Sequence, residues 1–256
     1  MQNFIDIVQN NEKYENAFID KSEALSLVNK ETLLVIVDTN KSNFVEIPEL
    51  LEKTEKIVVI DHHRRSTDYI DNAILMFHEV YASSAAELVT ELVQYTEKKI
   101  ELEQIEAESL YGGIMIDTKN FAFKTGVRTF EAAAYLRKCG VDIIKVKKWF
   151  QTDLEGYNKI ADIVKNAEKI RDNIGISIYD KIDKEASLIC ARAADELLTI
   201  SEITASFVIG NMGEKVCISG RSIGDINVQV ILEKLRRWRT YYSCRCTSWR
   251  YDMSRS

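Results

Sequence analysis

Two short apolar runs that each end in an aspartate most constrain how this chain can fold. The segments TLLVIVD (32–38) and KIVVID (56–61) are rich in Val and Ile up to the closing Asp. Uninterrupted hydrophobicity of this length is typical of strands covered on both faces, as in a parallel sheet. We therefore expect two parallel strands, joined by a helix over residues 46–55 that begins near Pro48. This pattern predicts an α/β fold.

Further helical and strand patterns follow along the chain. A capping box from Ser84 to Glu87 opens the first of the helices that are predicted over residues 84–99, 103–117, 128–140 and 153–172. Later strands are expected over residues 173–180, 203–210 and 214–222, and helices over residues 189–200 and 226–235. No Gly-, Ser- or Pro-rich linker occurs, so the boundary is expected within a helix. The predicted organisation is a domain over residues 1–150, a helical connector over 151–172 and a smaller α/β domain over 173–235.

Composition limits the classes of protein and partner. Hydrophobic residues make up 46% of the chain and charged residues 29%, as in globular proteins. No apolar run approaches the roughly 20 residues of a membrane span. The five cysteines lack metal-binding spacing and fit a reducing cytoplasm. Up to Leu235, 39 acidic residues outnumber 28 basic ones. This charge disfavours long nucleic acid but permits small phosphorylated ligands.

Acidic and imidazole side chains are predicted to meet at one edge of the first domain. Asp38 and Asp61 end the two strands, and Asp117 ends another apolar segment. Ligands of open α/β sheets bind beyond the carboxyl ends of the strands, and clustered carboxylates commonly bind divalent metals. His62 and His63 follow directly, and because neighbouring strand side chains diverge, one imidazole can reach a metal while the other faces substrate. Asp61 is expected to fix the tautomer of the metal-bound ring. Mixed imidazole and carboxylate ligation suits manganese better than calcium or magnesium.

These motifs, in this order, resemble the DHH phosphoesterase family. Over residues 15–235, VDTN, IDHHRR, YASSAAELVTEL and DTKNFAFKTGVRTFEAAAYLR are similar to the catalytic part of membrane-bound cyclic-di-AMP phosphodiesterases of the GdpP type. The resemblance implies a parallel-sheet DHH domain with two Mn2+ ions and a smaller DHH-associated domain that binds the nucleotide. It also implies hydrolysis of cyclic di-AMP to the linear dinucleotide by two-metal catalysis.

The resemblance assigns roles to residues of the first domain. Asp38 looks like the carboxylate that bridges both metals, and His62 and Asp117 look like further metal ligands. His63 is expected to act in catalysis at the phosphate, and Asp61 is counted with it as a catalytic residue.

Three residues are expected to bind substrate. Arg64 adds a cation beside the histidines, although a solvated surface position explains the pair Arg64 and Arg65 equally well. Arg221 and Ser222, in ISGRSIGDINV, look like nucleotide contacts. A turn after a strand is an equally good interpretation of the GRS tripeptide alone.

The chain departs from the family pattern at both ends. No histidine precedes His62, so we expect the family's first metal-binding motif, and the strand that carries it, to be missing. Residues 236–256 contain six arginines where the family has a glycine-rich segment. We interpret them as an aberrant, frame-shifted tail, with a basic nucleic-acid-binding arm as the alternative. Such a fragment would hold one metal ion or none and would be impaired or inactive.

Other functions stay open at this point. A nanoRNase-like hydrolase of short oligonucleotides keeps the fold and changes the substrate, and a nucleotide-binding module keeps the fold without catalysis. We expect a cytoplasmic location, with membrane anchoring in full-length relatives. A homodimer is compatible with the sequence, which does not determine the oligomeric state.

Overall fold

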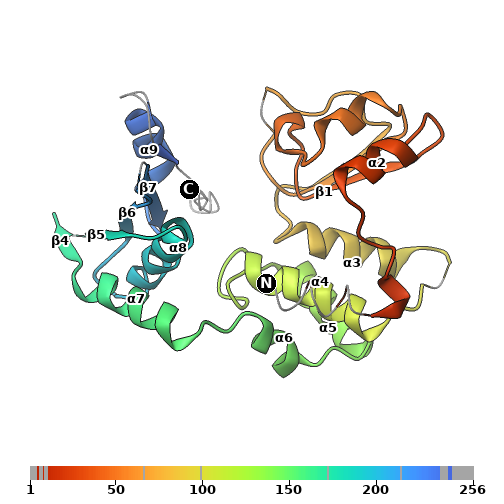
Figure 1. Cartoon of the computed structure of the whole chain (residues 1–256). Coiled ribbons are helices and arrows are strands. Elements are labelled where there is room, and N and C mark those ends of the chain that lie inside the picture. The colour runs from red at the N-terminus through yellow and green to blue at the C-terminus, as the bar shows by residue number, and fades with distance from the viewer. Residues whose placement is uncertain are drawn as a thin grey trace. The chain divides into compact units, whose positions relative to one another are not determined.

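The computed structural model describes Ile5, Val8 and residues 11–65, 67–98, 100–171, 173–213, 215–236 and 242–243. The chain divides into two compact units, Met1–Gln151 and Thr152–Ser256. Each unit combines helices with a sheet (Figure 1), which confirms the predicted α/β class. The predicted frame-shifted tail lies almost wholly outside the described residues. Within the described ranges, no helix has both the length and the apolar composition needed to cross a bilayer.

The sheet of unit 1 has three parallel strands. In spatial order they are β1 (Leu34–Val37), β2 (Ile57–Asp61) and β3 (Leu75–His78). The first two strands are those predicted from the apolar runs. Strand β3 was not predicted; none of its four residues is buried, so it lacks the mostly buried apolar run that identified β2. Because all three strands run in the same direction, Asp61 pairs with His78 at the edge beyond which the chain continues to the two histidines.

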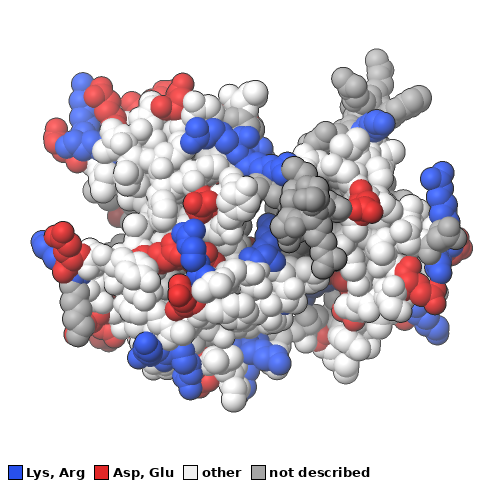
Figure 2. Space-filling view, turned by 180° about the vertical axis from the view of Figure 1, so that it is seen from behind, with Lys and Arg blue, Asp and Glu red and all other residues white. Residues whose placement is uncertain are grey.

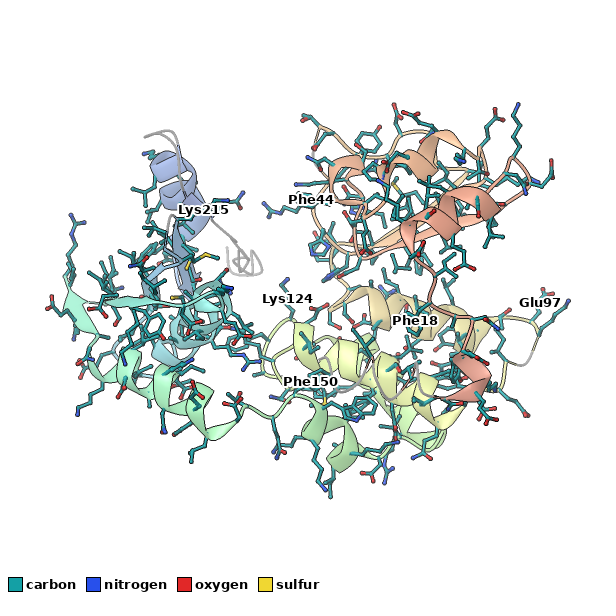
Figure 3. The ribbon with its side chains drawn as sticks, viewed as in Figure 1. Phe18, Phe44, Glu97, Lys124, Phe150 and Lys215 are labelled. Atoms are coloured by element: carbon teal, nitrogen blue, oxygen red, sulfur yellow. The ribbon has the colours of Figure 1, made fainter. Side chains whose placement is uncertain are left out.

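The connection between β1 and β2 differs from the prediction. Instead of one helix over residues 46–55, it contains two 3-10 turns, η2 (Ser42–Phe44) and η3 (Pro48–Glu52). Pro48 occupies the start of η3 as expected, and Leu50 is buried. Phe44, labelled in Figure 3, is exposed, and the Lys41 ammonium lies 5.0 Å from its ring centroid. With a single described residue of η3 buried, there is no continuous apolar face to stabilise a longer helix.

Helices complete unit 1. Their bounds are η1 (Glu12–Tyr14), α2 (Lys21–Leu27), α3 (Ala85–Tyr95), α4 (Gln104–Asp117), α5 (Val127–Lys138) and α6 (Ile143–Trp149). Figure 1 shows α2 beside the sheet and α4, α5 and α6 gathered on the far side of α3. Leu88 of α3 is fully buried in one cluster with Ile60 of β2, so α3 joins the sheet to the helical layer.

Two adjacent glycines let α4 approach its neighbours closely. A Cβ atom at Gly113 would lie 2.8 Å from the Cβ of Ala86 on α3. A Cβ atom at Gly112 would lie 3.2 Å from the ring of Phe150, labelled in Figure 3. Glycine inside a helix costs about 0.5–1 kcal/mol relative to alanine. Close packing of α4, which ends in Asp117, offsets that cost.

Unit 2 has a five-stranded mixed sheet. Its strands, in spatial order, are β4 (Glu168–Ile170), β5 (Ile174–Ile182), β6 (Ala205–Asn211), β7 (Val216–Ser222) and β8 (Tyr242–Ser243). Strands β5 and β6 are parallel, as are β7 and β8, whereas the other two pairs are antiparallel. The helices are α7 (Leu154–Lys165), α8 (Ala186–Leu197) and α9 (Val228–Arg236). Helices α7 and α8 share a core cluster on one face of the sheet, and α9 packs on the other.

Residues 151–172 contain helix α7 and strand β4, both in unit 2, rather than one continuous helix. The predicted helix over residues 153–172 therefore ends early, at Lys165. Residues 168–170 pair with β5 instead, across a turn in which Arg171 has a φ of 52°. Strand pairing with a distant part of the sequence overrides the local helical pattern.

Candidate metal centre and active site

The three predicted metal ligands converge in unit 1 from different elements. The Nε2 atom of His62 lies 3.5 Å from Oδ1 of Asp38 and 3.7 Å from Oδ2 of Asp117. Asp38 follows β1, His62 follows β2 and Asp117 ends α4. Parallel strands that end at the same edge explain the first pair, and the closely packed α4 supplies the third residue.

The backbone of Asp38 has a φ of 64°. This left-handed conformation is uncommon for residues other than glycine. The Asp38 N–H still donates to the carbonyl of Ile60 at 3.0 Å, which continues the ladder between β1 and β2. The chain therefore turns sharply at Asp38 while the residue stays anchored to the sheet, and such conformations cluster at functional sites.

The tautomer of His62 is fixed by a backbone carbonyl. His62 is buried, and its Nδ1 atom lies 3.3 Å from the carbonyl oxygen of Ala82. A carbonyl oxygen can only accept, so Nδ1 must carry the hydrogen. The lone pair is then on Nε2, the atom nearest Asp38 and Asp117. An imidazole whose Nδ1 hydrogen is held by a carbonyl presents Nε2 as its metal-binding nitrogen, here beside two carboxylates.

Asp61 binds the other histidine, which corrects one prediction. We expected Asp61 to orient the metal-bound ring of His62, but its Oδ1 accepts from Nδ1 of His63 at 2.8 Å. Strand side chains alternate between faces, so Asp61 shares a side with the residue two positions later rather than with the next one. The His62 and His63 rings meet edge to face, with centroids 4.4 Å apart. The carbonyl of Ala82 takes the role expected of Asp61.

Asn40 is a site residue that the sequence analysis missed. It is buried, and its Nδ2 atom donates to Oδ2 of Asp61 and, at 3.3 Å, to the carbonyl of His63. Its Oδ1 atom has no hydrogen-bond partner in the described part of the chain. The available signal was its place in VDTN, two positions after Asp38.

The electrostatics of the cluster favour a bound cation. Burial would raise the pKa of Asp61, but hydrogen bonds from His63 and Asn40 outweigh it and hold the pKa below its usual range. The hydrogen bond to Asp61 raises the pKa of His63. Burial also raises the pKa of Asp117; the nearby His62 opposes this rise and the Asp38 charge adds to it. Burial and the Asp38 charge thus disfavour the charged form of Asp117, and a bound cation would stabilise it.

The donor set fits a divalent transition metal. Asp38, His62 and His63 each offer a ligand atom within 4.8 Å of the others. Oxygen and imidazole nitrogen together suit manganese, zinc or iron better than calcium. Since Nδ1 of His63 is engaged by Asp61, Nε2 is the nitrogen left for another partner. The unpartnered oxygen of Asn40 offers one more acceptor beside the cluster.

Arg64 is exposed and has no ion pair with another described residue. Its neighbour Arg65 lies 4.7 Å from the ring centroid of Tyr69 and donates to the sulfur of Met76. Arg64 is therefore accessible to a ligand, whereas Arg65 packs on the protein surface.

The two predicted substrate residues of unit 2 are buried at the end of β7. The Nε atom of Arg221 donates to Oδ1 of Asp195 at 2.9 Å, and its Nη1 donates to the carbonyl of Gly220 at 3.0 Å. The hydroxyl of Ser222 accepts from the N–H of Gly224 at 3.2 Å. These contacts hold both side chains in fixed positions within unit 2.

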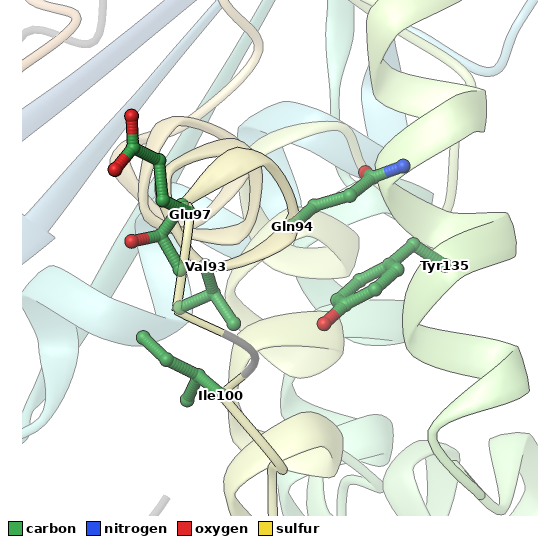
Figure 4. Close-up of a pocket in the computed structure, with 6 residues that line it drawn as sticks. Val93, Gln94, Glu97, Ile100 and Tyr135 are labelled. Atoms are coloured by element: carbon green, nitrogen blue, oxygen red, sulfur yellow. The ribbon is translucent and has the colours of Figure 1, made fainter.

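A separate cavity in unit 1 lies at the end of α3 (Figure 4). It has a volume of about 240 Å³ and is lined by Val93, Gln94, Thr96, Glu97, Ile100 and Tyr135. Glu97 is the one acidic side chain of this lining. The cavity includes none of the predicted site residues, so we assign it no part in the metal centre.

Comparison with known proteins relates these features to a family. Residues 3–114 match the DHH family, N-terminal domain. The chain is 43% identical over 238 residues to the cyclic-di-AMP phosphodiesterase GdpP of Bacillus subtilis (strain 168), covering 92% of this chain and 36% of the relative. It is 41% identical over 228 residues to the cyclic-di-AMP phosphodiesterase PdeA of Listeria monocytogenes serotype 1/2a (strain 10403S), covering 88% and 35%. The chain thus spans about a third of the length of these curated relatives.

A solved structure supports the fold. The crystal structure of an exopolyphosphatase-related protein from Bacteroides fragilis superposes with a TM-score of 0.70 at 19% sequence identity. The match covers 78% of this chain and 62% of that one. At this identity the likeness shows a shared fold and carries no assignment of activity.

Proposed function

Because this chain belongs to the DHH family, we propose that it is the catalytic region of a phosphodiesterase that hydrolyses cyclic di-AMP to the linear dinucleotide with two manganese ions. The observation that carries the proposal is that carboxylate oxygens of Asp38 and Asp117 both lie within 3.7 Å of the Nε2 atom of His62. The activity named for the two bacterial relatives supplies the substrate.

Each site residue of unit 1 has its own role in the proposed reaction. Asp38, His62 and Asp117 would hold the metal, which when bound supplies Lewis acidity at the phosphate and lowers the pKa of water. His63 would act on the phosphate, because its Nδ1 is occupied by Asp61 and its raised pKa keeps a proton on the ring at higher pH. Asp61 holds the His63 ring in place.

Substrate binding would use two arginines and one serine hydroxyl. Arg64 is exposed beside the histidines and would attract the phosphate. In unit 2, Arg221 is oriented by Asp195 and Ser222 by Gly224, and both would contact the nucleotide. Small anionic ligands remain compatible with the mixed surface charge. On the face shown in Figure 2, Lys and Arg alternate with Asp and Glu among the described residues instead of forming one basic stripe.

A hydrolysis assay tests the proposal directly. The chain is incubated with Mn2+ and cyclic di-AMP, and the products are separated by chromatography, with parallel reactions on the linear dinucleotide and on a short oligoribonucleotide. We expect the linear dinucleotide to form from cyclic di-AMP, at a low rate since the sequence predicts an impaired enzyme, and this product to disappear in Asp38→Asn. Asp162→Asn, at an exposed position on α7, is the matched control and should behave as wild type.

The other functions predict different outcomes. Faster turnover of the oligoribonucleotide or of the linear dinucleotide would indicate a nanoRNase-like hydrolase. Binding of cyclic di-AMP in a calorimeter without turnover would indicate a nucleotide-binding module. Neither binding nor turnover of any of the three substrates would contradict the proposal.

A further inference from the structure

The N-terminus of α3 holds a buried carboxylate in an unexpected arrangement. As the capping box predicts, Ser84 caps the helix, because its Oγ accepts the N–H of Glu87 at 3.0 Å. In a capping box, the Glu87 side chain would accept the N–H of Ser84; here it binds Ser83, one residue earlier. Its Oε2 accepts the Oγ–H of Ser83 at 2.5 Å and the N–H of Ser83 at 3.2 Å. Glu87 is 1% exposed and Ser83 0%.

Helix capping alone does not require a buried carboxylate. In α4, the reciprocal bond of the capping box runs from the N–H of Glu103 to Oε2 of Glu106 at 2.8 Å, and this bond is exposed to solvent. Removing a carboxylate from water is costly unless hydrogen bonds compensate for it. The burial of Glu87 therefore points to a further role at this position.

That role follows from the peptide that joins Ala82 to Ser83. The Ser83 N–H donates to Glu87, and the Ala82 carbonyl accepts from Nδ1 of His62 at 3.3 Å. The N–H and C=O of one trans peptide lie in a single plane and point in opposite directions. When Glu87 fixes the N–H, it also aims the carbonyl at His62. A negatively charged acceptor on the N–H polarises the peptide as well, so the carbonyl becomes a stronger acceptor.

The rest of the turn is held independently. The N–H of Ala82 donates to the carbonyl of Glu79 at 3.1 Å, and the N–H of Glu79 donates to the carbonyl of Asp61 at 3.0 Å. These bonds tie the turn to the end of β2. They leave the tilt of the Ala82–Ser83 peptide to be set by Glu87.

We propose that Glu87 is a positioning residue for His62. Through the Ala82–Ser83 peptide it keeps the hydrogen on Nδ1 of His62 and directs the Nε2 lone pair at Asp38 and Asp117. The inference rests on the proposed metal site, but it does not depend on which phosphodiester is hydrolysed.

The test compares Glu87→Met with Glu91→Met. Both variants replace a glutamate of α3 with a good helix former of similar length, and Glu91 instead pairs with Arg128 at 2.6 Å. Long-range proton–nitrogen correlation spectra of the metal-free protein report which nitrogen of His62 carries hydrogen, and a Mn2+ titration reports affinity. We expect Glu87→Met to lose the single Nδ1–H tautomer and to bind Mn2+ about 10–100-fold more weakly. Glu91→Met should retain both properties.

Two further variants complete the test. Glu87→Gln keeps an oxygen acceptor and should largely restore the tautomer. If Glu87→Met fails to fold, Ser83→Ala, which removes one of the two donors to Glu87, is judged by the same readouts. A wild-type tautomer and Mn2+ affinity in a folded Glu87→Met protein would overturn the inference. Failure of wild type to bind Mn2+ would count against the proposed function, while the tautomer comparison would still decide the role of Glu87.

Discussion

Asp38 and His62 follow two neighbouring parallel strands, and their Oδ1 and Nε2 atoms meet 3.5 Å apart. The contact depends on the backbone at Asp38, where a φ of 64° turns the chain at the edge of the sheet. Asp38 thus combines a strained backbone with a side chain suited to a metal. The two properties can be separated by substitution.

Asp38→Gly and Asp38→Ala should both lose Mn2+ binding by more than about 100-fold, because both remove the carboxylate. Their stabilities should differ. Glycine adopts a positive φ without strain, whereas alanine does not, so Asp38→Gly should be more stable than Asp38→Ala by about 1 kcal/mol. Urea unfolding of the metal-free proteins measures the difference. Equal stabilities would show that the left-handed conformation is not retained in solution.

Asn40→Ala should destabilise unit 1 by about 1–3 kcal/mol, because it removes a donor from the fully buried Asp61 carboxylate. Asn40→Asp should be worse at neutral pH, since it places a second carboxylate against Asp61. Chemical unfolding at pH 7 compares the two variants. If Asn40→Asp is the more stable variant, the contact between Asn40 and Asp61 is not formed as described.

Asp183→Asn should make unit 2 less stable in a pH-dependent way. The Glu185 N–H and the Lys159 ammonium are the main causes of the lowered pKa of Asp183. A carboxyl with a lowered pKa in the folded state stabilises the protein above its unfolded pKa of about 4, and this contribution is lost as pH falls through the folded value. Wild type should therefore exceed the variant by about 1 kcal/mol at neutral pH. The two unfolding curves should converge below about pH 4, and a constant gap down to acid pH would contradict the prediction.

Gly113→Ala should destabilise unit 1 by about 1–3 kcal/mol, although alanine is the better helix former. The added Cβ would lie 2.8 Å from the Cβ of Ala86, so α3 and α4 must move apart. Thermal unfolding measures the effect. Adding Ala86→Gly should recover part of the loss, and Gly126→Ala, whose Cβ meets nothing within 4 Å, serves as the control. Additive effects of the pair would rule out the close contact.

The sequence by itself determined the elements that carry strong local patterns. The apolar runs that end in Asp38 and Asp61 identified two parallel strands, because strands covered on both faces need uninterrupted hydrophobicity. Strand direction then placed these acids and the following histidines at one edge. The serine that caps α3 was also recognisable, since capping is a local hydrogen bond.

Other features were decided by contacts between distant parts of the chain. Strand β3 and the strand at residues 168–170 form because neighbouring strands pair with them, and neither was recognised as a strand from the sequence. The choice of His63 rather than His62 as the partner of Asp61 depends on which face each side chain occupies. The acceptor for His62 is a backbone carbonyl at Ala82, which any residue would supply, so no side chain marks it in the sequence. Only tertiary structure aims that carbonyl, because its direction depends on a peptide plane that a buried side chain in the first turn of α3 holds.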